Sequence, residues 1–270
     1  MRAFHQQFVR PDGAILTITG SLPKEKVIAA IEKYFGLWTH GVVDRPTLED
    51  PKPAVQPGIY VLQKNFKQAT VAVGHIGPKR NTSDYYDMTI FNDLYGHSGF
   101  NNRLFREVRT KRGLAYEVGG GLFPDIGAGL FQVVAQTRNE QVAEALRTII
   151  AITKESQTEL FSEKDFNNSF SSVEKSFVFK FEEPSSVVDR AALLDILEFP
   201  KDYDENYMDN LKKVTPSLVR DVAGRWIRPD DLVVVIVGNL SAEEVKKQFP
   251  DRKVYRLGFD DGPKVEVEVN

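Results

Sequence analysis

The hydrophobic residues of the first forty positions follow two different periods. Residues 14–19 form an apolar and β-branched run that is typical of a strand. After Ser21, a candidate helix cap, and Pro23, which the first turn of a helix tolerates, four apolar residues recur at helical spacing. These four are Val27, Ile28, Ile31 and Phe35. The segment therefore predicts one strand followed by one amphipathic helix.

Residues 41–57 differ in composition from what precedes them. Four prolines fall between positions 46 and 57, and apolar residues are few. A chain of this kind is semi-extended and contributes little to a core. We expect a linker here, which separates residues 1–40 from a domain formed by residues 58–270.

The strand pattern and the helical spacing both recur in the domain that follows the linker. Apolar or β-branched runs predict strands at residues 59–63, 70–75, 114–121, 129–137 and 232–237. Apolar residues spaced by three or four predict helices at about 83–95, 102–111, 142–153, 162–177, 187–197, 205–211 and 216–226. We expect an α+β fold with a largely antiparallel sheet and with the helices packed on one of its faces.

The end of the chain repeats its beginning. Arg228-Pro229-Asp230 precedes a strand and then a helix with a Ser241/Glu244 capping box, as Arg10-Pro11-Asp12 precedes the first strand and helix. A chance similarity of two strand–helix units is the alternative to duplication. Duplication predicts that residues 1–40 are the last strand–helix piece of a preceding domain, whose body lies outside this chain.

Composition narrows the possible partners. The chain is 41% hydrophobic and 27% charged, which is ordinary for a globular protein, and its formal net charge of −3 disfavours nucleic acid as a ligand. The longest apolar run, residues 232–237, is far shorter than the roughly 20 residues that span a bilayer. Residues 1–10 contain no apolar stretch like that of a signal peptide. We expect no nucleic acid and no membrane span, in a soluble protein of the cytoplasm or the periplasm.

Patterns for hydrolytic chemistry are absent from the sequence. None of the four histidines follows a glutamate, and no two lie three to five residues apart, so H-E-x-x-H and H-x-x-E-H are both missing. The chain has no cysteine, which removes thiolate nucleophiles and thiolate ligands. Gly-x-Ser-x-Gly does not occur, and Gly119-Gly120-Gly121 lacks the lysine of a phosphate loop. We expect no metal and no complete catalytic site in this chain.

Residues 102–116 carry a more informative pattern. The helix expected at 102–111 ends at Gly113, and the strand that follows can return Tyr116 to the side of the last helical turn. Arg109 and Tyr116 would then lie together and could donate hydrogen bonds to a peptide carbonyl or to its oxyanion. Alternatively, the basic residues of this helix only complement its dipole, and Tyr116 is a half-buried strand residue.

This stretch resembles the signature of the C-terminal, inactive domain of the insulinase/pitrilysin family of zinc peptidases, which includes mitochondrial processing peptidase. The matching residues are Gly96 and Gly99 in a loop, then Asn102-Arg103-Leu104-Phe105, then Arg109 paired with Tyr116. The surrounding strand–helix units fit as well, so the resemblance covers nearly the whole chain.

The resemblance implies a division of labour between two halves. In the family, an N-terminal domain with H-x-x-E-H binds zinc, and a C-terminal domain of the same fold closes a chamber over the peptide. The resemblance implies that Arg109 and Tyr116 contact a peptide substrate, with Gly96, Gly99 and Asn102 in the loop nearby. The chain would be inactive alone, and its partner would be a zinc-binding catalytic half, upstream in the same protein or in a separate chain. The start within a domain fragment favours the upstream position.

Two other functions stay open. The chain could be a structural or regulatory subunit, like the family's non-peptidase members in respiratory complexes. It could also be an anion- or nucleic-acid-binding module that uses the basic helix, although the acidic balance of the chain disfavours this function.

Overall fold

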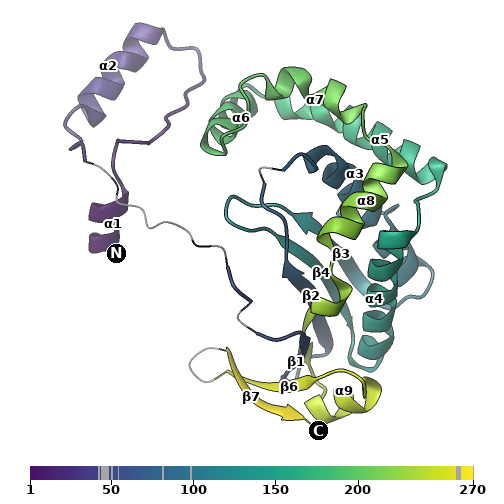
Figure 1. Ribbon diagram of the computed structural model, residues 1–270. Coiled ribbons are helices and arrows are strands. Elements are labelled where there is room, and N and C mark those ends of the chain that lie inside the picture. The colour runs from purple at the N-terminus through teal and green to yellow at the C-terminus, as the bar shows by residue number, and fades with distance from the viewer. Residues whose placement is uncertain are drawn as a thin grey trace. The chain divides into compact units, whose positions relative to one another are not determined.

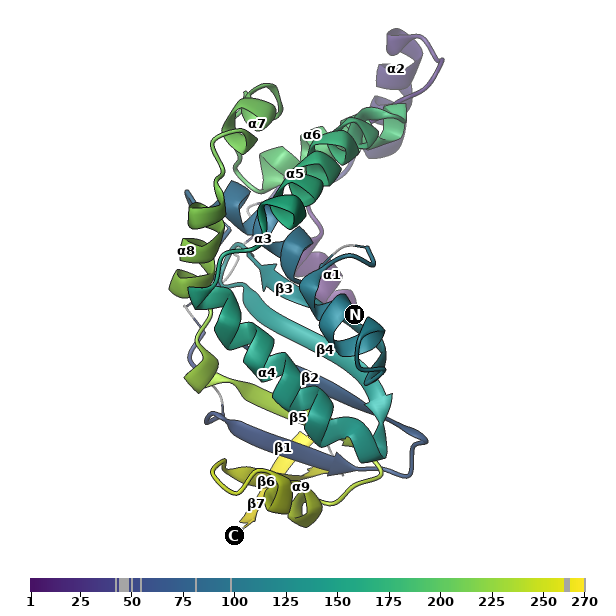
Figure 2. The ribbon, with the colours of Figure 1, turned by 90° about the vertical axis from the view of Figure 1, so that its right-hand side faces the viewer.

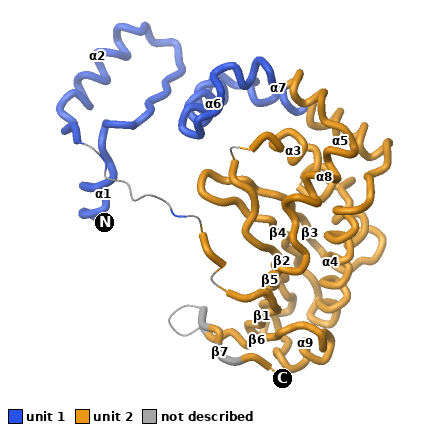
Figure 3. The backbone as a smooth tube through the Cα atoms, in the orientation of Figure 1, with its two compact units in different colours: residues 1–49, 175–207 blue, residues 50–174, 208–270 orange. Residues whose placement is uncertain are grey.

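The computed structural model describes residues 1–41, 43, 49, 51–53, 55–80, 82–97, 99–259 and 263–269. The chain divides into two compact units, coloured separately in Figure 3. Unit 1 comprises Met1–Glu49 and Lys175–Tyr207, and unit 2 comprises Asp50–Glu174 and Met208–Asn270. Unit 2 contains the sheet and most of the buried apolar side chains.

Among the described residues, unit 2 is built on a seven-stranded sheet with the order β3-β4-β2-β5-β1-β6-β7. The strands are β1 (Gly58–Gln63), β2 (Gln68–Ile76), β3 (Ala115–Phe123), β4 (Leu130–Arg138), β5 (Val233–Gly238), β6 (Val254–Phe259) and β7 (Pro263–Val269). Strand β1 runs parallel to both β5 and β6, and the other four pairings are antiparallel. This confirms the predicted, largely antiparallel sheet.

The central strands bury one face and leave the other open. Strand β4 buries Phe131, Val133 and Ala135, and the residues between them are exposed. Helix α4 (Val142–Thr158) lies across the buried face, against β2 and β4 (Figure 2). Beside it lie α3 (Tyr85–Tyr95), α8 (Pro216–Trp226) and α9 (Ala242–Gln248) (Figure 1). The predicted packing of the helices on one face is confirmed.

A buried carboxylate joins α3 to α8. Asp84, at the start of α3, accepts hydrogen bonds from Arg225 Nη1 at 2.5 Å and from Trp226 Nε1 at 2.8 Å. Burial opposes the charge of Asp84, but these hydrogen bonds outweigh burial and lower the pKa of the carboxyl. The network fixes α3, whose C-terminal end contacts the edge strand β3.

The second part of unit 1 is a set of helices held by aromatic and charged contacts. The end of α5 (Glu163–Phe177) meets α7 (Tyr203–Leu211), where Phe177 stacks on Tyr207 with ring centroids 4.1 Å apart. From α6 (Pro184–Ile196), Arg190 Nε donates to both carboxylate oxygens of Asp204 at 2.8 and 2.9 Å. The predicted apolar stripe of α5 therefore serves packing, with Phe166 and Val173 buried.

The first part of unit 1 departs from its prediction. A short helix, α1 (Arg2–Phe8), precedes residues 14–19, which form no strand. Helix α2 (Lys24–Phe35) forms as predicted, but it begins after Pro23 without a side-chain cap and buries none of its residues. A strand is stable only when a neighbouring strand pairs with it, and Ile15, Leu16 and Ile18 are exposed here. The strand prediction is therefore wrong for this structure.

The predicted linker lies partly outside the described residues. Residues 42, 44–48, 50 and 54 belong to that undescribed part. The described residues of 41–57 form neither helix nor strand, in keeping with their proline content.

A buried histidine makes the stability of unit 2 dependent on pH. His75 Nε2 accepts from the backbone N–H of Arg228 at 2.9 Å, and Nδ1 lies 2.9 Å from the carbonyl oxygen of Ile76. Both contacts are satisfied by the neutral ring, and burial lowers the pKa of His75 below 6.5.

We predict that His75 makes a constant contribution to the free energy of unfolding above pH 6.5. As the pH drops below that value, the free energy of unfolding falls. The unfolded chain then binds a proton that the folded chain excludes. Urea unfolding between pH 7.5 and 5 measures the loss, and His75→Gln should flatten the slope. His5→Gln, at an exposed position, should leave the slope as in the wild type. Equal slopes for all three proteins would contradict the prediction.

Candidate functional site

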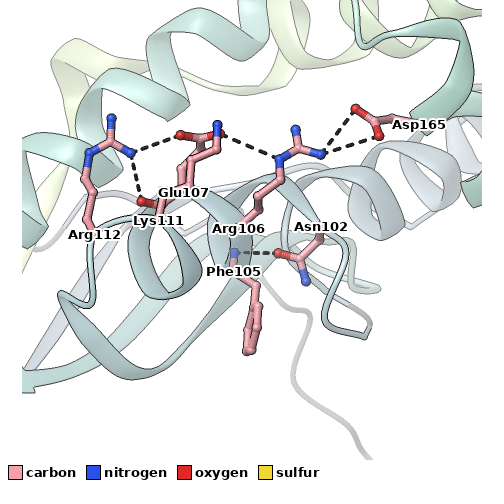
Figure 4. Close-up of polar contacts among 7 residues, drawn as sticks. All are labelled: Asn102, Phe105, Arg106, Glu107, Lys111, Arg112 and Asp165. Atoms are coloured by element: carbon pink, nitrogen blue, oxygen red, sulfur yellow. Dashed lines mark hydrogen bonds and ion pairs between the residues drawn. The ribbon is translucent and has the colours of Figure 1, made fainter.

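The predicted helix at 102–111 forms, but its central part is a π-helix. Element η1 (Phe105–Thr110) is closed by a hydrogen bond from Lys111 N to Arg106 O, five residues back, at 2.9 Å. Asn102 is buried and anchors its start. Asn102 Oδ1 accepts from Phe105 N at 2.8 Å (Figure 4), and Asn102 Nδ2 donates to Gly99 O at 3.0 Å. A π-turn inserts one residue into a helix and is frequent at functional sites.

A second inserted residue lies in the strand that follows. Gly113, with φ of 62°, turns the chain from η1 into β3. Ala115 pairs with Thr137 and Glu117 with Gln136, so Tyr116 is an extra residue in a β-bulge. Bulges redirect a side chain, and Tyr116 is 69% exposed.

These two irregularities bring Arg109 and Tyr116 together. The guanidinium carbon of Arg109 lies 5.3 Å from the centroid of the Tyr116 ring and 4.7 Å from that of Phe105. Both contacts are within the range of a cation–π interaction, worth about 0.5–1 kcal/mol at an exposed site. The predicted neighbours therefore do meet, and their contact runs through the face of the tyrosine ring. Their role toward a substrate stays a prediction.

Three other cations of this segment are paired with carboxylates (Figure 4), whereas Arg103 lies over the Phe161 ring and forms no ion pair among the described residues. Glu107 accepts from Lys111 at 2.7 Å and from Arg112 at 2.9 Å, and Arg106 lies 3.4 Å from Asp165. Burial of Glu107 opposes its charge, but the two hydrogen bonds outweigh burial and lower the pKa of Glu107. Within the described part of the chain, Arg109 forms no ion pair.

Gly96 has a packing function that its place in a loop did not reveal. It ends α3 against the edge strand, where Gly120 N donates to Gly96 O at 3.0 Å. A Cβ on Gly96 would lie 2.5 Å from Leu104 Cδ1 and 2.9 Å from Gly120 O. A Cβ on Gly121 would lie 2.4 Å from Oδ1 of Asn92, whose side chain hydrogen-bonds both Leu122 N and Leu122 O. The close approach of Gly96 and Asn92 explains the glycines at 119 and 121, while a Cβ on Gly120 would meet Gln132 O and Val133 of β4.

Gly99 differs from Gly96 because its constraint lies in the backbone. Its φ is 66°, a conformation that favours glycine, and nothing lies within 4 Å of the place a Cβ would take. The predicted proximity of Gly96, Gly99 and Asn102 to a substrate stays a prediction, while Gly96 and Asn102 each have a structural role.

The described residues were compared with the requirements of a metal site and of a membrane-spanning helix. They contain no group of three or more His, Asp or Glu side chains arranged to hold a metal ion. No helix in the described ranges combines the length and the apolar character needed to cross a bilayer.

Comparison with known proteins assigns the fold. A family model described as the peptidase M16 inactive domain matches residues 1–171, more than half of the chain. The chain belongs to the peptidase M16 inactive-domain family. This confirms the resemblance to the inactive domain of zinc peptidases.

Relatives of this M16 domain carry the name of zinc proteases. An uncharacterized zinc protease of Streptomyces coelicolor is 22% identical over 258 residues, which cover 92% of this chain and 54% of that protein. YmxG of Bacillus subtilis, also an uncharacterized zinc protease, is 22% identical over 87% of this chain and 56% of its own length. The chain spans about half the length of the curated relatives it matches.

Solved structures agree with the M16 fold. The peptidase M16 inactive domain from Pseudomonas fluorescens matches with a TM-score of 0.68 and 22% identity, over 82% of this chain and 52% of that one. A protease from Helicobacter pylori matches with 0.76 and 18%, over 87% and 58%. A chain of complex III from Candida albicans matches with 0.60 and 13%, over 85% and 57%. At these identities the structures show the fold alone.

We predict that Gly96→Ala destabilises the domain by about 2–3 kcal/mol, because the new methyl group meets Leu104 and the backbone of Gly120. Urea unfolding at pH 7.5 measures the loss. Gly224→Ala is the matched control, since its Cβ would meet only Gln157 O at 3.8 Å and alanine favours the α8 helix. The packing function of Gly96 would be contradicted by equal stability of the two variants.

Proposed function

We propose that this chain is the non-catalytic, substrate-binding half of a zinc metallo-endopeptidase. The observation that carries the proposal is the set of contacts that the Arg109 guanidinium makes. Its guanidinium contacts the rings of Phe105 and of the exposed Tyr116, while carboxylates neutralise its neighbours Arg106, Lys111 and Arg112. A cation held in this way, without an ion pair among the described residues, is suited to an uncharged acceptor such as a peptide carbonyl.

The chemistry of the pair fits peptide hydrolysis by a metal in the other half. Arg109 carries a permanent charge and several N–H donors, and the Tyr116 hydroxyl adds one further donor. Both can hydrogen-bond the carbonyl oxygen of a bound peptide. They bind it more strongly as it gains negative charge, which lowers the barrier to hydrolysis. Zinc in the catalytic half supplies the activated water.

The same proposal accounts for the exposed N-terminal segment. Residues 14–19 have the pattern of a strand without pairing, and α2 buries none of its side chains. We propose that residues 1–40 complete the catalytic half, that residues 41–57 link the halves, and that residues 58–270 form the C-terminal domain. The relatives have room for such a half, because the matched region covers only 54% and 56% of their length.

A structural or regulatory subunit is the second candidate. The similarity to a chain of complex III from Candida albicans supports it, because there the same fold occurs within a respiratory complex. In that case Arg109 and Tyr116 would not contact a peptide. The nucleic-acid alternative is disfavoured, since three cations of the basic helix are paired with carboxylates and the chain carries a net charge of −3.

We predict peptidase activity on unfolded peptides only when this chain is combined with the half that bears H-x-x-E-H. In the combined enzyme, Arg109→Ala should lower kcat/KM by about 100-fold, and Tyr116→Phe by about 10-fold or more, because each removes a donor to the developing oxyanion. Arg112→Ala is the control, since Glu107 already engages Arg112. Its kcat/KM should stay close to the wild-type value.

Two outcomes would overturn this function. Hydrolysis by the chain alone would require a catalytic site within it. Activity of the combined enzyme that is unchanged in Arg109→Ala and Tyr116→Phe would favour the structural subunit.

A further inference from the structure

The open face of the central sheet is almost free of charge. The residues that β2, β4 and β5 direct to this face are Gln68, Thr70, Ala72, Gly74, Ile76, Leu130, Gln132, Val134, Gln136, Arg138, Val233, Val235 and Val237. Arg138, at the end of β4, is the charged residue among them. They form regular cross-strand rows, such as Val134–Ala72–Val235. An antiparallel sheet with one face in water normally carries polar and charged residues there. This face is therefore suited to covering by apolar or uncharged groups.

A cavity of about 720 Å³ lies at one end of this face. Its floor is apolar and is formed by Ala72, Ile76, Leu130, Val233 and Val235 around Gly74, while the charged residues Lys52, Arg228 and Asp231 also line the cavity. Its volume is that of an ordinary ligand pocket. One wall is built by described residues between Pro51 and Pro57, so extended polypeptide of this chain already borders the apolar floor.

A second hollow shares Gln132 with this cavity and reaches Glu117, the residue after Tyr116. It has a volume of about 470 Å³ and is lined by Glu117, Gly119, Val134 and Gln136, and Gln132 lines both hollows. Glu117 directly follows Tyr116 and is paired with Gln136. The two hollows meet at Gln132 and follow β4 from Gln136 to Leu130, and we call this stretch the track.

The length of the track determines how many peptide residues separate the candidate site from the apolar cavity. Gln136 and Leu130 are six residues apart on one strand, and a strand rises by about 3.3 Å per residue, so the track is about 20 Å long. An extended peptide has nearly the same rise. A peptide held at Arg109 and Tyr116 therefore reaches the apolar cavity with the side chain about six residues away.

We propose that this track is a specificity region that binds an extended peptide and takes a large apolar side chain into the cavity at Leu130 and Val235. The inference rests on the proposed function, because it places the peptide carbonyl at Arg109. Gln132 and Gln136 can donate to and accept from a peptide backbone along the track. The ligand class is an extended peptide with an aromatic or aliphatic residue about six positions from the cleaved bond.

Equilibrium binding to the chain tests the cavity. The probes are fluorescein-labelled peptides of ten Gly, Ser and Gln residues, with and without one Phe, measured by fluorescence anisotropy. The wild type should bind the Phe peptide at least about 5-fold more tightly, because the cavity removes the ring from water. Leu130→Gln with Val235→Thr should abolish this preference. Leu160→Gln should retain it, since Leu160 is 52% exposed, like Leu130 at 50%, and lies outside the track.

Separate readouts distinguish this inference from the proposed function. Arg109→Ala should weaken both peptides alike and leave their ratio unchanged, so the ratio reports on the cavity and the absolute affinity on Arg109. A wild type without a Phe preference would overturn the inference, and so would a preference that survives Leu130→Gln with Val235→Thr. A chain that sediments as a dimer, loses the dimer in that double variant and binds neither peptide would make this face an interface between copies, against the inference.

The spacing is tested in the combined peptidase. As Phe is moved along the peptide, kcat/KM should be highest when Phe lies about six residues from the cleaved bond, and this maximum should vanish in Leu130→Gln with Val235→Thr. A flat profile in the wild type would overturn the spacing.

Discussion

One-sided burial of the sheet is the constraint on which the rest of the structure depends. Helix α4 places Leu146 and Ile149 against the buried face, and fully burying each of these large aliphatic side chains contributes about 1.5–3 kcal/mol. Because the pleat alternates strictly, every residue buried on β4 leaves its neighbour on the open face. The same packing that stabilises the domain therefore also creates the uncharged surface on which the inferred track lies.

The candidate site depends on this frame through β3, the edge strand next to β4. The end of α3 covers the outer side of β3 by way of Gly96 and Asn92, and Gly119 and Gly121 in β3 permit the close approach. With β3 fixed, one extra residue in η1 and one in the bulge decide where Arg109 and Tyr116 lie. The domain thus positions Arg109 and Tyr116 by a π-turn and a β-bulge within elements that are themselves well packed.

The sequence was most informative where local chemistry decides the structure. The Ser241/Glu244 capping box forms with both of its hydrogen bonds, at 2.7 and 3.2 Å. The meeting of Arg109 and Tyr116 was also predicted, because Gly113 forces the chain to reverse between them.

The sequence was least informative where distant segments decide the structure. The π-turn of η1 and the bulge at Tyr116 depend on packing against α3 and β4, so no local pattern indicates them. Strands β6 and β7 were missed, because charged residues interrupt their apolar runs, as is common at the edge of a sheet. Residues 14–19 show the converse case, since their strand pattern is real but strand formation requires a partner.

A double-mutant cycle between Arg109 and a single peptide carbonyl tests the central claim most directly. Affinities for the intact chain would be measured with a peptide and with its analogue in which one carbonyl is reduced to CH2, for wild type and Arg109→Ala. A charged hydrogen bond predicts a coupling free energy of about 1.5–3 kcal/mol for one carbonyl position. Additive effects at every carbonyl position, with no coupling to Arg109, would contradict the substrate-binding function.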